Sequence, residues 1–462
     1  MVKTTYRKLK HIHMIGIGGT GMNGIAEVLF NLGYKVTGSD VGTNEATARL
    51  TRLGAKIAVG HQAENVRGAD VVVTSTAIRE ENVEVREARR LKIPVIPRAE
   101  MLAELMRMKM GIAIAGSHGK TTTTSMIAVL LDKAGFDPTI VVGGRLNTIG
   151  ANAKLGAGDF FVAEADESDR SFLMLSPFIA VLTNIDAEHL DQYKGVEDIQ
   201  KDFVKFANKV PFYCPIVLCL DDPQLQSIIP QLERRLITYG FSTQSDIYAR
   251  DLNFAAFTSR STLHYKGRPM GTLKLNVPGK HMVSNAMAAV AVGLDLDIAP
   301  KLILEALESY SGTGRRFEFK GEPGGVMIVE DYGHHPTEIK ATLDGAKRGW
   351  ERRLVAVFQP HRFTRTFHLL HDFARAFNQA DVLVLTEIYP AGETPIPGVT
   401  GKALYDEVVR FGHKDVHFEP DPAAIPARLE KIVRPGDIVI VLGAGNINRI
   451  IPDLIRRLEP RP

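Results

Sequence analysis

The sequence predicts an α/β protein made of three α/β modules in series. Short β-branched runs alternate with amphipathic helical stretches along the chain. Two glycine-rich turns each join an apolar strand to a helix, which is typical of parallel sheets that bind nucleotides. The 462 residues are also too many for one ordinary domain.

The first module is expected over residues 1–107. Its strands are the runs "HIHMIGI", "KVTGSD", "DVVVTST" and "IPVIP", with helices between them that extend through Leu32 and Leu53. The helix "AEMLAELMRM" closes the module. Because strands and helices alternate, we expect a parallel sheet wound with helices, of the Rossmann-like kind.

The second module is expected over residues 108–312 and the third over 313–462. Strands of the second are "GIAIA", "DFFVAE", "FIAVLTNI" and "PIVLCL", followed by the β-rich stretch "STLHYKGRPMGTLKLNVPG" and helices near Tyr310. A glycine-rich stretch, "SYSGTGRRFEF", marks the second boundary. The third module repeats the alternation with "GVMIVEDYG", "RLVAVFQPH", "ADVLVLTEIY", "DVHFEP" and "DIVIVLGAG".

Composition excludes several classes of protein. A net charge of +3 does not favour a nucleic-acid partner or an anionic membrane surface. No apolar run approaches the ~20 residues of a membrane span. Cys214 and Cys219 could form a disulfide or a metal site, but we expect buried free thiols in a reducing compartment. We therefore expect a cytoplasmic protein. The sequence does not fix the oligomeric state, and both a monomer and a homodimer stay open.

The first glycine-rich turn predicts a site for a diphosphate. A strand-to-helix turn, where backbone N–H groups attract anions, carries Gly16, Gly18, Gly19, Gly21 and Gly24. Asp40 follows about 20 residues later, the usual place of a ribose-binding acid. A tight turn without a ligand, NAD, or another diphosphate–ribose ligand would all fit this pattern.

The second glycine-rich turn predicts an ATP site. Gly116, Gly119, Lys120 and Thr121 form G-x-x-G-K-T, and Ile114 stands where a full Walker A motif has its first glycine. The loop is therefore tighter. Its lysine is still suited to β- and γ-phosphates, and its threonine hydroxyl to Mg²⁺.

Acidic residues follow two neighbouring strands of the second module. The first group is Glu164, Asp166, Glu167 and Asp169, and the second is Asn184, Asp186, Glu188, His189 and Asp191. Each acid alone could be a helix cap or a surface charge. Together, at the carboxyl edge of a parallel sheet, they predict one or two Mg²⁺ ions, with Mn²⁺ as an alternative.

Seven ordered motifs resemble those of the Mur ligases of peptidoglycan synthesis. They are "GIGGTGM", "GSHGKTTT", "EADESD", "NIDAEHLD", "GTGRRFE", "EDYGHHPTE" and "QPHRFTRT", spread over nearly the whole chain. The chain is most similar to the members that attach L-alanine to UDP-N-acetylmuramate with ATP. The resemblance implies a UDP-sugar-binding first domain, a central P-loop ATPase-like domain, and a Rossmann-like C-terminal domain that binds the amino acid and closes. It also implies an acyl-phosphate intermediate.

The resemblance assigns roles residue by residue. Implied catalytic residues are Lys120, Glu164, His189, Arg316 and Asp331. The implied ATP site is Gly116, Ser117, His118, Gly119, Lys120, Thr121, Thr122, Asn285, Arg316 and Asp331. The implied UDP-sugar site is Gly18, Gly19, Thr20, Gly21, Asp40, Ser75 and Thr76. The implied amino-acid pocket is Tyr332, His334, His361, Arg362 and Arg365, and the implied metal ligands are Thr121, Glu164 and His189.

The sequence departs from the family at one position and leaves two rivals. Met282 stands where members usually have an asparagine for the adenine base. Neither Lys201 nor Lys205 falls cleanly at the position of the carbamylated lysine of sister ligases, so we assign no such modification. The rivals are the recycling ligase that attaches a whole tripeptide to the same sugar nucleotide, and an NAD-dependent oxidoreductase or nucleotide sensor.

Overall fold

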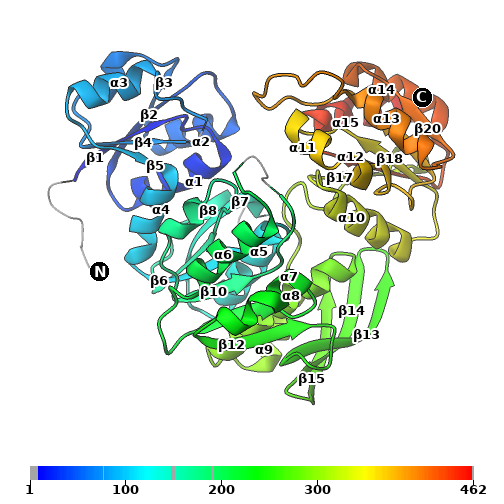
Figure 1. The fold of residues 1–462 in the computed structure, drawn as a ribbon, viewed down its shortest axis with the longest axis horizontal. Helices are drawn as coiled ribbons and strands as arrows, with labels where there is room; N and C mark the ends of the chain where they lie inside the picture. The colour runs from blue at the N-terminus through cyan, green and yellow to red at the C-terminus, as the bar shows by residue number, and fades with distance from the viewer. Residues whose placement is uncertain (1–8, 76, 147–150, 189–191, 460–462) are drawn as a thin grey trace. The chain divides into compact units, whose positions relative to one another are not determined.

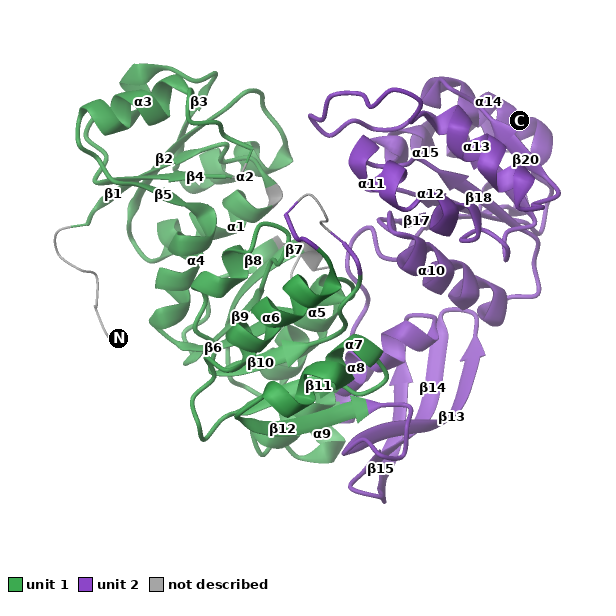
Figure 2. Ribbon diagram, in the orientation of Figure 1, with its two compact units in different colours: residues 1–186, 195–239, 288–303 green, residues 187–194, 240–287, 304–462 purple. Residues whose placement is uncertain are grey.

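A computed structural model describes residues 9–75, 77–146, 151–188 and 192–459 (Figure 1). The chain divides into two compact units (Figure 2). Unit 1 holds residues 1–186, 195–239 and 288–303, and unit 2 holds 187–194, 240–287 and 304–462. Among the described helices, none is long and apolar enough to cross a bilayer.

The first sheet of unit 1 is fully parallel, with strand order β3-β2-β1-β4-β5. Its strands are β1 (His11–Ile15), β2 (Lys35–Asp40), β3 (Lys56–Val59), β4 (Val71–Thr74) and β5 (Val95–Pro97). Its helices are α1 (Thr20–Asn31), α2 (Glu45–Leu53), α3 (Val83–Arg90) and α4 (Arg98–Arg107). The predicted parallel sheet is confirmed. The sequence missed β3, a short edge strand whose side chains are only partly buried.

The strand order of this sheet reverses between β1 and β4. A crevice opens outside the carboxyl ends of parallel strands at such a switch point, and ligands bind there. The glycine-rich turn follows β1 and Ser75 follows β4. The topology therefore places both predicted parts of the UDP-sugar site at the switch point.

The second sheet of unit 1 has the order β12-β11-β10-β6-β9-β7-β8. Its strands are β6 (Met110–Ala115), β7 (Thr139–Leu146), β8 (Ala151–Lys154), β9 (Phe160–Glu164), β10 (Ile179–Leu182), β11 (Pro215–Cys219) and β12 (Arg235–Gly240). Helices α5 (Lys120–Lys133), α6 (Val196–Ala207) and α7 (Pro223–Ile228) accompany it. Cys214 and Cys219 are buried free thiols, as predicted.

Unit 2 contains an antiparallel meander and a C-terminal sheet. The meander is β13 (Ile247–Ala255), β14 (Thr258–Tyr265) and β15 (Arg268–Leu275). Helices α8 (Lys280–Asp295) and α9 (Pro300–Glu308) each hold residues of both units. The C-terminal sheet has the order β16-β17-β21-β18-β19-β20 and is parallel except for β16.

The C-terminal sheet is built from short strands and covering helices. The strands are β16 (Glu318–Gly321), β17 (Met327–Asp331), β18 (Leu354–Phe358), β19 (Val382–Leu385), β20 (Val416–Phe418) and β21 (Ile438–Leu442). The helices are α10 (Pro336–Gly349), α11 (Phe363–His368), α12 (Leu370–Ala374), α13 (Gly401–Arg410), α14 (Ile425–Ile432) and α15 (Ile451–Leu458). Because alternate residues face opposite sides, Val329 and Ile440 join one apolar layer while Ile328 and Val439 join the other. The sheet is thus buried on both faces, as in other parallel sheets.

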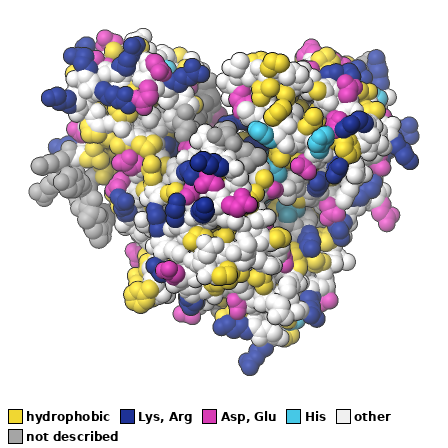
Figure 3. All heavy atoms as spheres, in the orientation of Figure 1, with side chains coloured by type: hydrophobic (Ala, Val, Ile, Leu, Met, Phe, Trp, Pro, Cys, Tyr) yellow, Lys and Arg dark blue, Asp and Glu magenta, His cyan; other side chains and the backbone are white. Residues whose placement is uncertain are grey.

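Charged side chains of both signs are mixed over the face drawn in Figure 3, on both units. This mixing agrees with the small net charge of +3. It gives that face no extended field of one sign of the kind that steers nucleic acids.

A buried carboxylate stabilises the first sheet. Glu84 on α3 is fully buried and accepts hydrogen bonds from Ser39 (2.6 Å), the Asn65 amide (2.5 Å) and the Gln62 backbone N–H (3.1 Å). His13 Nε2 lies 3.4 Å from the same carboxylate. Burial alone would raise the pKa of Glu84, but these hydrogen bonds outweigh it and lower the pKa to about 2.

We expect Glu84→Gln to destabilise the protein by roughly 3 kcal/mol at pH 7, because each pKa unit is about 1.4 kcal/mol. The folded-state pKa is depressed, so this contribution is present above the unfolded value of 4.5 and is lost as pH falls toward 2. Chemical unfolding from pH 7 to pH 3 should show the difference between the two proteins shrinking. A difference that stays constant with pH would contradict the ionised state of Glu84.

Candidate active site

Backbone hydrogen bonds to β2 fix the conformation of the first glycine-rich turn. Gly16 (φ +75°) and Ile17 donate from their backbone N–H groups to the Ser39 carbonyl at 2.8 and 3.1 Å. Gly19 caps α1 without a side-chain hydrogen bond. The first turn of α1 is thus free of a capping side chain, which suits an anionic ligand.

Asp40 holds this turn in place. Its carboxylate accepts a hydrogen bond of 2.8 Å from the Gly18 N–H. A Cβ at Gly18 would lie 2.9 Å from the same oxygen and 2.8 Å from both Asn44 and Thr47, so any larger residue would force these side chains to shift. A ribose contact by Asp40 stays a prediction, and its second carboxylate oxygen is the atom left for it.

Three further residues belong to the implied UDP-sugar site, and the structure describes two of them. Ser75 Oγ lies 3.3 Å from where a Cβ of Gly16 would stand, so it borders the turn. Thr20 is the first residue of α1. Thr76 lies outside the described residues.

The second turn requires both of its glycines. Gly116 has φ +148°, and a Cβ there would stand 1.9 Å from Thr183 Oγ1, an impossible distance. Gly119 has φ +81° and caps α5, whose first residue is Lys120. The loop therefore joins β6 to the amino end of α5 in the geometry of a phosphate-binding loop.

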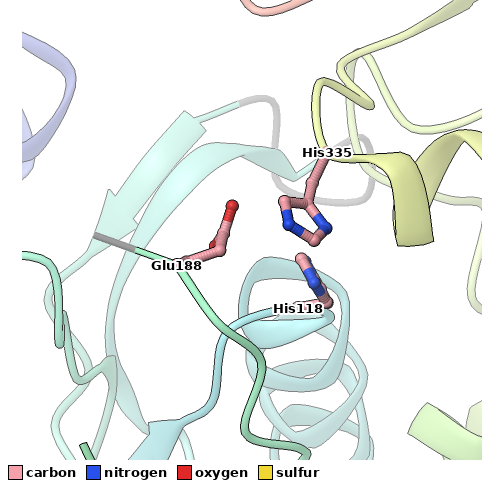
Figure 4. A group of neighbouring side chains, drawn as sticks. All are labelled: His118, Glu188 and His335. Carbon is pink, nitrogen blue, oxygen red and sulfur yellow. The ribbon is translucent and has the colours of Figure 1, made fainter. Parts of the chain in front are cut away.

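The end of β10 fixes the conformation of this loop. The Asn184 side chain accepts from the His118 N–H at 2.8 Å and donates to the His118 carbonyl at 3.0 Å. Thr183 Oγ1 donates to the same carbonyl at 2.7 Å, and the Asp186 N–H donates to Ser117 Oγ at 2.8 Å. His118, labelled in Figure 4, has its Nε2 3.0 Å from Asp186. The sequence grouped Asn184 and Asp186 with the candidate metal ligands. In the structure, both make hydrogen bonds that support the phosphate loop.

Lys120 is paired with a buried carboxylate. Its ammonium donates to the Gly116 carbonyl at 2.5 Å and to Glu167 at 2.8 Å. Glu167 is 2% exposed, and burial raises its pKa to about 7 even though Lys120 favours its ionised form. Its neighbour Asp166 has a lowered pKa, because Lys120 and Arg98 outweigh burial. The sequence had grouped Glu167 with the metal acids, and its contact with Lys120 was not predicted.

Glu164 ends β9 and contacts β7. Its carboxylate accepts a 2.7 Å hydrogen bond from the Gly143 N–H. A Cβ at Gly143 would stand 3.0 Å from that carboxylate, so Gly143 makes the approach possible. Of the other two implied metal ligands, Thr121 is the second residue of α5. His189 lies outside the described residues. Carboxylate and hydroxyl oxygens at this sheet edge are the donors that Mg²⁺ prefers, so the residues present fit the ion.

In unit 2, Asp331 lies at the carboxyl end of β17. It accepts hydrogen bonds from the Phe317 N–H (2.8 Å) and the Gly333 N–H (2.7 Å). Burial raises the pKa of Asp331, although Arg316 opposes the shift. Arg316 stacks over the Tyr332 ring at 5.1 Å and lies 3.5 Å from Glu338. Arg316, Asp331 and Tyr332 therefore lie close together, and the roles that the resemblance implies for them stay predictions.

Arg315 has a structural role that the sequence did not reveal. It stacks over Tyr332 at 4.8 Å, donates to Glu330 at 2.7 Å, and donates to the Gly443 carbonyl at 2.9 Å. It thus ties β17 to the turn after β21. A double arginine in the sequence does not tell which contacts each of the two side chains makes.

The predicted amino-acid residues gather at the carboxyl ends of β17 and β18. The His334 ring lies 5.3 Å from Tyr332 and 5.9 Å from His361. Arg365 donates to the Nδ1 of His361 at 3.2 Å, so that nitrogen is an acceptor and the ring is neutral. Burial lowers the pKa of His334 to about 4, and burial and nearby positive groups lower the pKa of His361 to about 3.

Arg362 and Tyr389 complete this group. Arg362 has φ +72° and donates its backbone N–H to the Tyr389 carbonyl at 2.9 Å. The Tyr389 ring stacks on His361 with centroids 5.6 Å apart. Sequence reasoning missed Tyr389, although its place just after β19, at the same sheet edge, was a usable signal. The next residue after His334, His335, caps α10 and accepts from the Thr337 N–H. Its side chain is drawn in Figure 4.

Asn285 and Met282 both lie in α8. Asn285 is 9% exposed and Met282 is 3% exposed. Both side chains are thus largely buried, and a contact of either with adenine stays a prediction.

Three Mur ligase models together match most of the chain. Residues 11–110 match the Mur ligase family catalytic domain, 114–293 the Mur ligase middle domain, and 315–445 the Mur ligase glutamate ligase domain. Each matched range corresponds to one α/β domain. The boundaries that we placed at residues 107/108 and 312/313 stay predictions.

The chain belongs to the Mur ligase family, a class of ATP-dependent ligases. It is 58% identical to a UDP-N-acetylmuramate–L-alanine ligase of Pelobacter propionicus over 456 residues, covering 98% of this chain and 99% of the relative. The ligase of the same name from Geobacter sulfurreducens is also 58% identical over 456 residues, with the same coverage.

Solved structures have the same fold as this chain. A UDP-N-acetylmuramate-alanine ligase of Thermotoga maritima superposes with a TM-score of 0.82 at 30% identity, covering 97% of this chain and 98% of that one. A murein peptide ligase of Psychrobacter arcticus gives 0.73 at 24% identity over 98% of this chain and 99% of that one, which shows the fold alone.

Proposed function

We propose that this chain ligates L-alanine to UDP-N-acetylmuramate, with ATP as the energy source, in peptidoglycan synthesis. The observation that carries the proposal is the 58% identity, over essentially the full length of both chains, to a ligase of that name. The site is consistent with it. One sheet of unit 1 carries a turn suited to a diphosphate, and the other carries a phosphate loop with a lysine.

The proposed reaction has two steps. A carboxylate oxygen of the lactyl group attacks the γ-phosphorus of ATP, and the bond to ADP breaks. The amino group of L-alanine then attacks the acyl carbon of the acyl phosphate, and inorganic phosphate leaves as the amine loses its proton. Two anions meet in the first step, so Lys120 has to neutralise charge at the γ-phosphate.

The other residues would position the reactants. Arg362 and Arg365 are suited to bind the alanine carboxylate, because a guanidinium pairs with a carboxylate through two parallel hydrogen bonds. Asp331 and Arg316 would contact the nucleotide when it binds. Thr121 and Glu164, with His189, would hold Mg²⁺, which supplies further positive charge at the phosphates when bound.

An assay of ADP release tests the function. The full chain is given ATP, Mg²⁺, UDP-N-acetylmuramate and one of L-alanine, glycine, L-serine or the tripeptide L-Ala-γ-D-Glu-meso-diaminopimelate. We expect turnover with L-alanine to exceed that with the tripeptide. Turnover with the tripeptide alone would make the chain a recycling ligase. NAD binding without ATP turnover would support an oxidoreductase or nucleotide sensor instead.

Met282 leads to a prediction about the nucleotide base. An asparagine amide can offer adenine a donor and an acceptor, whereas a thioether offers almost no hydrogen bond and packs on the ring face. We expect GTP to be used within roughly tenfold of ATP, because one bidentate base contact is worth about 1–3 kcal/mol. Met282→Asn should widen the preference for ATP. Rejection of GTP by more than about a thousandfold would mean that another group reads the base.

A further inference from the structure

Arg98 lies against the glycine-rich turn of the first sheet. It is the first residue of α4. A Cβ at Gly21 would stand 3.0 Å from Arg98 Cδ, 3.1 Å from Nε and 3.2 Å from Nη1. The guanidinium therefore lies over the first turn of α1. It can do so because Gly21 has only a hydrogen where another residue would have its Cβ.

The guanidinium has donors to spare. Its Nη2 lies 3.4 Å from Asp166 Oδ2, which is long for a charge-assisted hydrogen bond. Arg98 makes no other ion pair or side-chain hydrogen bond with the residues that the structure describes. Since a guanidinium carries five N–H donors, most of this fork is available to an anion.

The surroundings keep the fork in position. The Arg98 side chain is 20% exposed, so its stem is packed rather than free in solvent. Asp166 follows β9 of the second sheet, and Gly21 is the second residue of α1, just after the glycine-rich turn of the first sheet. Arg98 thus contacts two places at once. One is the turn that we assign to the sugar nucleotide, and the other is the acidic loop that follows β9, which holds Asp166 and the Lys120 partner Glu167.

We propose that Arg98 binds the diphosphate of the UDP-sugar, as a second positive group beside the N–H groups of α1. The proposal rests on the proposed function. A planar guanidinium pairs with two phosphate oxygens at once, which fixes the orientation of the diphosphate as well as its charge. The sugar end would then extend from Arg98 toward the acidic loop, where the lactyl carboxylate has to meet ATP.

The test is calorimetric titration of the full chain with UDP. We expect Arg98→Ala to weaken UDP binding at least tenfold, and Arg98→Lys to weaken it less. The matched control is Arg107→Ala at the other end of α4, which removes an arginine 57% exposed and paired with Glu104, and should leave UDP binding unchanged. In the activity assay, Arg98→Ala should raise the KM for the UDP-sugar at least tenfold and that for ATP less than twofold.

Two results would separate the claims. UDP affinity of Arg98→Ala within twofold of the parent would overturn the role of Arg98 and leave the ligase function intact. A parent protein that does not bind UDP would contradict the proposed function itself.

Gly21→Ala provides a second, independent test. Gly21 lies within α1 without a positive φ, and alanine is the better helix former, so the variant should fold. Its methyl group should displace the guanidinium and weaken UDP binding several-fold. In the Arg98→Ala background the same change should have little effect. Equal losses in both backgrounds would mean that the methyl group blocks the ligand directly, and would contradict the placement of Arg98.

Discussion

Replacing Lys120 with alanine should reduce turnover by at least ~10²-fold, the usual effect of removing an electrostatic stabiliser of a transition state. The ammonium lies at the amino end of α5 and already contacts the loop through the Gly116 carbonyl. In the proposed first step it would neutralise the γ-phosphate as the carboxylate approaches. Steady-state ADP release with saturating substrates is the measurement.

The structure changes what the control for this variant must be. The Lys120 side chain is only 16% exposed and pairs with the buried Glu167. Lys120→Ala removes an ion-pair partner of that buried side chain, and removing one partner of a buried ion pair is destabilising. Lys120→Ala/Glu167→Gln should therefore recover stability without recovering activity. Near-normal turnover by either folded variant would contradict the role of Lys120.

Replacing Arg365 with alanine should raise the KM for L-alanine by roughly 10- to 100-fold, because hydrogen bonds to a charged group are worth about 1.5–3 kcal/mol. The Arg365 side chain is 12% exposed, so water screens it little. The KM values for ATP and the UDP-sugar should change less than twofold. Initial rates with varied L-alanine give these constants.

Arg375→Ala is the matched control for this prediction. Arg375 is an exposed arginine of the same domain that stacks over Phe411 at 4.6 Å. It should leave all three KM values unchanged. Arg365→Lys, which keeps the charge and loses the fork, should fall between the parent and Arg365→Ala. An unchanged KM for L-alanine in folded Arg365→Ala would remove Arg365 from the amino-acid pocket.

Strand patterns predicted most of the fold because buried parallel strands are continuous apolar runs. The runs around Ile112, Val162, Val181 and Val217 all became central strands of one sheet. The edge strand β3 was missed, since its half-exposed side chains carry little pattern.

The sequence predicted which residues belong to the candidate site better than it predicted the contacts among them. Gly116 and Lys120 lie within one loop, so spacing alone relates them. The pairing of Lys120 with Glu167 and the stacking of Tyr389 on His361 join residues of different strands and loops. Such contacts depend on strand order and side-chain direction, which a single sequence does not state.

The central claim is that the chain activates the carboxylate of UDP-N-acetylmuramate as an acyl phosphate and transfers it to L-alanine. Its most direct test uses substrate labelled with ¹⁸O in the lactyl carboxylate, with mass analysis of both products. We predict UDP-N-acetylmuramoyl-L-alanine together with inorganic phosphate that carries one ¹⁸O, because the attacking oxygen leaves with the phosphorus. Formation of the amide with unlabelled phosphate would contradict the account.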